Sequence, residues 1–251
     1  MIGALARRSA KRDGGFSFIE LLIAMTITLL LAGAIAGVAR PARVVFDRVP
    51  AELELHQRGR IAIEALSQAV RAALRIPGAA GVVTELTVIV PAGTGRGTLL
   101  VDQPGPGGAI TLGTEHCPNI EDLCGFMAGA TAMIEDGESY EVFSIAATSV
   151  TTRVVTPARA LSQAYPSEST VVEVDQLTFE LDEQSDGSYS LIRETAAGAV
   201  QPIVDAIGDL SFDVSPQLVD VWISVEPPAG SLRPLLSGRT FRTAIKLRNA
   251  P

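Results

Sequence analysis

The amino-acid sequence predicts an α+β protein in which one long N-terminal helix packs on an antiparallel β-sheet head. The first observation is an apolar run from Phe16 to Ala39, in which Glu20 is the one ionisable residue. The second is that apolar residues keep recurring at steps of three and four beyond this run, which is the period of a helix. The third is a change to a period of two after residue 80, where many of the 23 glycines and 15 prolines divide the chain into short segments.

The apolar run from Phe16 to Ala39 is long enough to cross a membrane. As a helix it would extend about 36 Å, against roughly 30 Å for the hydrocarbon core of a bilayer. Residues 1–15 form a basic leader, which favours retention of that end in the cytoplasm; its cations are Arg7, Arg8, Lys11 and Arg12. A cleavable secretory signal has a shorter apolar stretch, of about 7 to 15 residues. Because GVA at 37–39 has the character of a cleavage site, a secretory signal and a plain signal anchor remain alternatives.

Glu20 is costly in such a run, and neither alternative explains it. A carboxylate at the centre of a membrane helix costs on the order of 3 kcal/mol, and less near the interface. Gly14 and Gly15 precede Phe16, and Glu20 follows four residues later in the segment GFSFIELL. This segment resembles the prepilin-type N-terminus of type IV pilins and of the pseudopilins of type II secretion systems.

The resemblance implies a processing pathway and a role for each matching residue. A prepilin peptidase, acting also as a methyltransferase, would cut after Gly15, and Phe16 would become the N-methylated N-terminus. Glu20 would then meet the freed amino group of Phe16 on a neighbouring subunit, and this pairing would make a buried carboxylate tolerable. Residues 1–15 are then a cleaved leader, and residues 16–39 are the transmembrane and polymerisation helix.

Two glycines in the membrane half of the helix are spaced for close helix packing. Gly33 and Gly37 form a small-xxx-small pair, which lets helices approach in lipid, although both residues are also ordinary in membrane helices. The helix-interrupting proline of many major pilins is absent, because Pro41 comes only after the apolar run.

Residues 40–77 are predicted to form an amphipathic periplasmic helix. Pro50 is expected to kink this helix or to mark its restart, and Pro77 is expected to end it near Arg75. His56 is interpreted as a surface residue. One face is apolar and the other faces are polar; the apolar residues are Leu55, Ala62, Leu66, Ala69, Val70 and Ala73, and the polar residues are Arg60, Glu64, Gln68 and Arg71.

Residues 78–251 are predicted to form a β-rich globular head, as in the pilin-like fold that the resemblance implies. The segment PAGTGRG at 91–97 is interpreted as a glycine-rich loop, since it lacks the ending and the following helix of a phosphate loop. Trp222 is expected at the core or its rim, on the strand 217–227, whose other face carries Val219, Val221, Ile223 and Val225. Further strands are expected at 81–90, 98–103 and 109–113, and hairpins at 131–150 and 172–195.

Cys117 and Cys124 are predicted to form a small disulfide loop, because the head would be exported past a membrane. A zinc site is the alternative, but one histidine and two cysteines in a single short loop do not match known zinc spacings; the further ligands would be His116, Glu121 and Asp122. A calcium site also lacks the regular ligand spacing, and its ligands would be Asp182, Glu183 and Asp186. No metal and no cofactor are therefore predicted.

Three further segments resemble the minor pilin PilW and its type II secretion counterpart GspJ. They are LSQAVRAA, YSLIRETAAGAVQPIVDAIGDLSFDV and RTFRTAIKLRN, and the matching elements are Ile192–Glu194, Pro202–Phe212 and Ile245–Asn249. The resemblance implies a minor pilin near the tip of a type IV pilus, or a minor pseudopilin. It implies as partners the peptidase, other pilins or pseudopilins, the inner-membrane assembly platform and membrane lipid. The subunit would lie first in the bacterial inner membrane, with a periplasmic head. Residues 80–165 resemble nothing comparable and are expected to carry partner specificity.

Other functional classes are disfavoured by composition. The net charge is −8 and the leader is basic, so that the rest of the chain is strongly acidic and poorly suited to nucleic acid. The only histidines are His56 and His116, and no Ser-His-Asp or Cys-His arrangement is readable, which disfavours an enzyme. A membrane-anchored binding domain that never polymerises remains an alternative, and it would not need Glu20.

Overall fold

The computed structural model describes residues 17–78, 80–100, 102, 108–113, 123–227 and 237–248. It has the predicted α+β fold, with an N-terminal helix followed by an antiparallel β-sheet head. The chain divides into two compact units, Met1–Ala51 and Glu52–Pro251, of which we call the second the head unit. Gly15, Phe16 and Cys117 lie outside the described residues.

Helix α1 runs without interruption over Phe18–Ala72. The expected restart at Pro50 is therefore wrong, because a proline removes a single backbone hydrogen bond and the helix on either side continues. The end at Ala72 confirms the prediction of an end near Arg75. After it, Leu74 donates its backbone N–H to Ile89 at 2.8 Å, and Ile89 donates to Arg75 at 2.9 Å.

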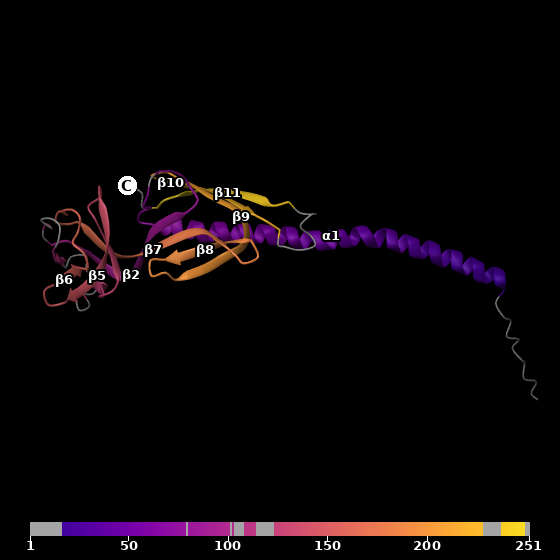
Figure 1. Ribbon diagram of the computed structural model, residues 1–251, viewed down its shortest axis with the longest axis horizontal. Helices are drawn as coiled ribbons and strands as arrows, with labels where there is room; N and C mark the ends of the chain where they lie inside the picture. The colour runs from indigo at the N-terminus through magenta and orange to yellow at the C-terminus, as the bar shows by residue number, and fades with distance from the viewer. Residues whose placement is uncertain are drawn as a thin grey trace, which may run out of the picture. The chain divides into compact units, whose positions relative to one another are not determined.

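The strands of the described chain form one antiparallel sheet in the order β11-β10-β9-β8-β7-β4-β5-β6-β3, with β1 paired to β9 and β2 paired to β7 (Figure 1). A short 3-10 helix, η1, covers Leu123–Gly125. The strands are β1 Gly81–Val83, β2 Leu86–Thr98, β3 Ile110–Thr111, β4 Thr131–Glu135, β5 Tyr140–Ser149, β6 Val154–Pro157, β7 Thr170–Glu183, β8 Tyr189–Thr195, β9 Val200–Val214, β10 Leu218–Val225 and β11 Arg239–Lys246. Both predicted hairpins are confirmed, as β4–β5 and β7–β8.

The main core of the head unit lies between α1 and the strands β7 to β11. The predicted apolar face is confirmed, because its six residues, of which Ala73 directly follows the end of α1, are all at most 9 % exposed. The alternation in β10 is confirmed as well, and its inward residues are fully buried: Val219, Val221, Ile223 and Val225. Phe241 of β11 packs against this core beside Gly59 of α1.

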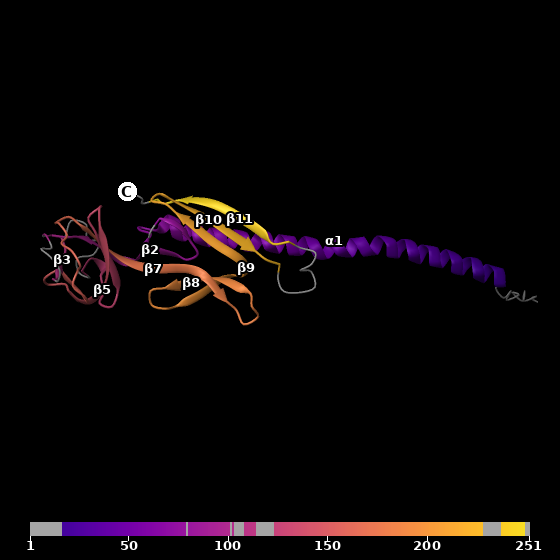
Figure 2. The same ribbon diagram turned by 45° about the horizontal axis from the view of Figure 1, so that its top comes forward.

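A second core lies around β3 to β6 and η1, and it includes Leu112, Phe143 and Tyr165. These strands lie on the opposite side of β7 from β9, β10 and β11 (Figures 1 and 2). Strand β7 contributes Val171 to this core and Phe179 to the main core. It therefore belongs to both parts of the head.

The prediction of a loop at 91–97 is wrong, because this segment is part of β2. Pro91 pairs with Val174 and Arg96 pairs with Val172, so that residues 92–95 bulge out opposite Glu173. A glycine at position 93 makes the bulge possible. Its φ is 55°, and a Cβ there would collide with the Glu173 carboxylate. Of the strand expected at 98–103, the described part is a strand only at its start, because β2 ends at Thr98 and Leu99 makes an isolated bridge to Leu112.

Candidate functional site

The apolar start of α1 is the first candidate site. The helix begins at Phe18, and the carbonyl of Ser17 accepts backbone N–H groups from Glu20 at 3.0 Å and from Leu21 at 3.1 Å. Glu20 lies in the first turn, where the helix dipole favours a negative charge. The predicted cleavage residues Gly15 and Phe16 lie outside the described residues, and their roles stay predictions.

The large apolar side chains of this segment are not buried against any other part of the described chain. Over Phe18–Ala39 the mean hydropathy is 2.4, and none of the most apolar stretch is buried. Large apolar side chains face outward all around the helix, from Phe18 at 75 % exposure to Leu30 at 74 % and Val38 at 72 %. A helix that is apolar on every face requires lipid or other apolar helices around it. Its length and composition are those of one membrane span.

Polar groups within the span differ in how they are satisfied. Thr26 donates its hydroxyl to the carbonyl of Ile23 at 2.8 Å, and Thr28 donates to Ala24 at 2.7 Å. These hydroxyls therefore cost little in an apolar medium. Among the described residues, no cation lies within ion-pairing distance of the exposed Glu20. Burial of this carboxylate in an apolar medium would be costly without a partner, and the cost is smaller near the membrane interface.

The two glycines of the span serve no packing purpose within the described chain. A Cβ added at Gly33 or at Gly37 would meet nothing within 4 Å. Both therefore leave helix backbone open on the outer surface, where another helix can approach.

The zinc alternative is not tested, because His116, Cys117, Glu121 and Asp122 lie outside the described residues. The described residues contain no group of three or more His, Cys, Asp or Glu side chains that could hold a metal ion. Asp186 is a turn residue: it accepts the Ser188 hydroxyl at 2.6 Å and the Ser188 N–H at 3.0 Å, and these bonds lower its pKa. Cys124 is buried and disulfide-bonded, but Cys117 lies outside the described residues, so their pairing stays a prediction.

The remaining singled-out residues have structural surroundings. His56 is exposed and meets the Phe241 ring edge-on at 5.8 Å. Trp222 is half-buried at the rim, as expected, and the Arg242 guanidinium lies 4.8 Å from its ring centre. Arg242 also pairs with Asp220 at 3.6 Å.

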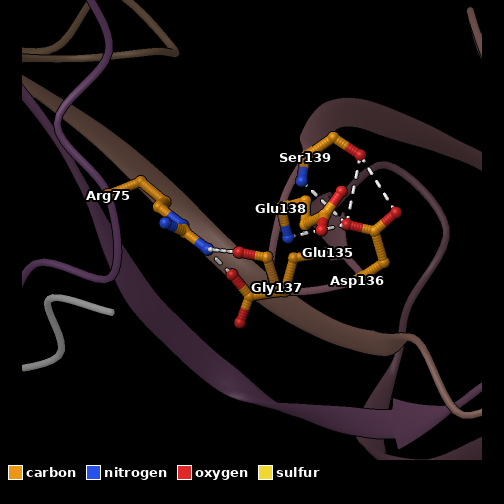
Figure 3. A network of polar contacts seen from close by, with 6 residues as sticks. All are labelled: Arg75, Glu135, Asp136, Gly137, Glu138 and Ser139. Atoms are coloured by element: carbon orange, nitrogen blue, oxygen red, sulfur yellow. Dashed lines mark hydrogen bonds and ion pairs between the residues drawn. The ribbon is translucent and has the colours of Figure 1, made fainter.

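A cluster of polar contacts just after the C-terminal end of α1, here called the polar junction, was not predicted from the sequence. Arg75 donates from Nε to Glu135 at 3.2 Å and from Nη2 to the carbonyl of Gly137 at 3.5 Å (Figure 3). In the same turn, Asp136 accepts the backbone N–H of Ser139 at 2.7 Å, which lowers the pKa of Asp136. The junction ties the end of α1 to the β4–β5 hairpin. In the sequence, Arg75 is recognisable only as a cation just after the end of a helix. Its partner Glu135 is 60 residues away, so the pairing could not be predicted from local sequence.

The α1 helix and its antiparallel head together have the pilin-like layout, in which an apolar helix continues into the core of a β-sheet head. Residues 10–36 match a family model, the prokaryotic N-terminal methylation motif. The chain thus carries the N-terminal motif of prepilin-type proteins, over the segment that holds the candidate site. No curated protein and no solved structure matches the chain.

Proposed function

We propose that the protein is a PilW-like minor pilin of a type IV pilus, cut after Gly15, N-methylated at Phe16 and assembled through its N-terminal helix. The observation that carries the proposal is Glu20: a carboxylate without a cationic partner in the described chain, on a helix that is apolar on every face, within the methylation motif. Its role is structural rather than catalytic.

Cleavage supplies the missing cation. Before processing, the chain has no amino group next to Phe16; after it, the new N-terminus is positive and lies one helical turn from Glu20. In an apolar medium, the α-amino group of one subunit and the Glu20 carboxylate of its neighbour stabilise each other. Assembly thereby depends on processing, because an uncleaved subunit leaves the carboxylate unpaired.

The head supports a position near the tip of the filament. Beyond the main core it carries a second core around β3 to β6, so the head has two packed parts. A head of this size is easier to accommodate as one copy at the filament tip than as repeated copies along a thin filament. A GspJ-like minor pseudopilin of a type II secretion system is the second candidate, because the motif at residues 10–36 belongs to both systems.

The proposal is tested by replacing Glu20. We expect Glu20→Ala to be cut and to stay in the inner membrane, while it is lost from sheared filaments. Glu64→Ala is the matched control, since Glu64 is an exposed acid on the same helix and should not affect assembly. The measurements are immunoblots of the inner-membrane fraction and of the sheared filaments. A mass spectrum identifies the N-terminus of the mature protein. Normal filament levels of Glu20→Ala, or an N-terminus other than N-methyl-Phe16, would contradict the proposal.

A further inference from the structure

Arg193 places a cation on the core-facing side of the sheet, on a strand that has a neighbour on each side. Arg193 of β8 pairs with Phe179 of β7 and with Gln201 of β9. Directly paired residues of neighbouring strands point to the same face, and Phe179 is buried in the main core. The Arg193 side chain therefore points toward α1, at the border of an apolar core.

The guanidinium of Arg193 is incompletely paired. Its Nη2 donates to the side-chain oxygen of Gln201. Its Nε is buried and has no hydrogen-bond partner among the described residues. No carboxylate of the described chain lies within ion-pairing distance of Arg193. A buried donor without an acceptor is unfavourable, so the site can gain from an acceptor supplied by another molecule.

Arg193 lines a groove of about 470 Å³ between α1 and strands β2, β7, β8 and β9. Apolar residues beside it include Ala65, Ala69, Ala72, Phe179 and Ile203, and the polar Gln68 and Gln201 also line the groove. Gln68 and Gln201 at its border are exposed, so the groove is open to the surface of the head. This volume lies in the range of sites that hold a ligand.

A protective role against strand pairing does not explain this cation. Inward-pointing charges can prevent aggregation at the edge of a sheet. At Arg193, however, β8 is paired on both sides, by β7 and by β9. The position is interior to the sheet, where an aliphatic residue would extend the main core.

We propose that this groove binds an apolar, carboxylate-bearing segment of another protein subunit, with the carboxylate on Arg193. A guanidinium and a carboxylate are complementary in charge and in the geometry of their hydrogen bonds. The apolar walls favour a peptide over a free inorganic anion, because an anion alone gains nothing from them. The Arg193 side chain has to turn for Nε to reach the ligand, since Nε is covered in the open groove. Only the identity of the partner as a pilus subunit rests on the proposed function.

The test uses the full mature chain in detergent and two blocked tripeptides, acetyl-Leu-Glu-Leu-amide and acetyl-Leu-Gln-Leu-amide. The readout is the Nε–H cross-peak of Arg193 in nitrogen-15 NMR spectra, titrated with each peptide and with acetate. We expect a saturable shift with the glutamate peptide and affinity about tenfold lower for the glutamine peptide, because charge-assisted bonds are the stronger ones. Acetate should bind more weakly than the glutamate peptide.

Variants separate the local cation from the general charge. Arg193→Gln should abolish the preference for the glutamate peptide, as followed by the Ala69 methyl signal. Arg71→Gln is the control, because it removes an exposed cation of α1 that does not line the groove. Ala72→Phe should weaken both peptides, since it fills the exposed end of the groove while Arg193 stays in place.

Four results would overturn the proposal: no binding of either peptide, equal affinity for both, a preference that survives Arg193→Gln, or acetate binding as tightly as the glutamate peptide. If Arg193→Gln fails to fold, the proposal is still tested by the relative affinities of the two peptides for the wild-type chain and by their weakened binding to Ala72→Phe. Because the assay uses single subunits, it does not depend on polymerisation, and a failure of the Glu20 experiment leaves its outcome unaffected.

Discussion

Gly59 allows an aromatic ring of the last described strand to touch the backbone of α1. A Cβ at this position would lie 2.4 Å from Cε2 of Phe241, which is far inside any real contact. The glycine is therefore required by its neighbour and not by its own backbone conformation. Its contribution is invisible to helix propensity, which would favour alanine by about 1 kcal/mol.

We expect Gly59→Ala to destabilise the protein by about 1 kcal/mol, because the cost of overpacking exceeds the gain in helix propensity. The measurement is the free energy of unfolding in denaturant. In a Phe241→Ala background the same substitution should be neutral or stabilising, since the clash is gone. Destabilisation of equal size in both backgrounds would show that the ring is not the cause.

Glu180 is a carboxyl group that the fold disfavours in its charged form. Burial raises its pKa, and the negative charges of Glu85, Glu194 and Asp182 raise it further. A folded-state pKa above the unfolded value means that the folded state binds the proton more tightly. Stability due to this group therefore increases as the pH falls through its raised pKa.

We expect Glu180→Gln to stabilise the protein at pH 7, and this gain to disappear in acid, where the wild-type side chain is protonated too. Asp136→Asn provides the opposite case. The pKa of Asp136 is lowered, chiefly by the Ser139 N–H, so its stabilisation is present above the unfolded pKa and is lost as the pH falls through the folded one. Melting temperatures measured from pH 3 to pH 7 should show opposite trends for the two variants.

At the scale of single elements, the bulge in β2 shows where sequence patterns stop being informative. Glycine and proline are depleted in strands, so the segment 91–97 predicts a loop. The ladder to β7 continues through it, because the extra residues fold over Glu173, whose side chain accepts the backbone N–H of Gly95 at 3.1 Å. Glu173 is 8 % exposed, and its partner is 78 residues away in the chain. No local pattern carries that pairing.

A pair of glycines isolates the contribution of this contact. Gly93 and Gly198 both have positive φ, 55° and 78°, but an added Cβ would meet Glu173 Oε2 at 2.3 Å in the first and nothing within 4 Å in the second. Gly198→Ala should cost about 1 kcal/mol from the backbone alone. Gly93→Ala should cost at least about 1 kcal/mol more. Equal losses in denaturant unfolding would mean that the bulge yields without strain.

The predictable elements are those with a strong period of their own. The apolar face of α1, the alternation of β10 and the hairpins β4–β5 and β7–β8 were all evident from local spacing. The first candidate site was evident too, because Glu20 and its neighbours form one short motif. Arg75 with Glu135, and Arg193 with its groove, depend on strands that meet only in the folded sheet.

For the whole molecule, the division at Ala51 leads to a direct prediction. The described buried residues of the main core lie between Leu55 and Leu247, and none of them belongs to the N-terminal unit. We expect a chain that starts at Glu52 to fold with the same sheet and to unfold cooperatively in water. Circular dichroism and hydrogen exchange would measure this. A molten product, without protected amides in β9 and β10, would show that the head needs the preceding helix.

Strand β7 runs through both cores, and this has a mechanical consequence. Its ladder to β2 joins residues 86–91 to 174–179 and residues 96–98 to 170–172, with the bulge between. A pull along β7 loads these bonds in shear, so that they bear tension together. A pull across the strand opens them one after another, and we expect the head to yield to it at a much smaller load.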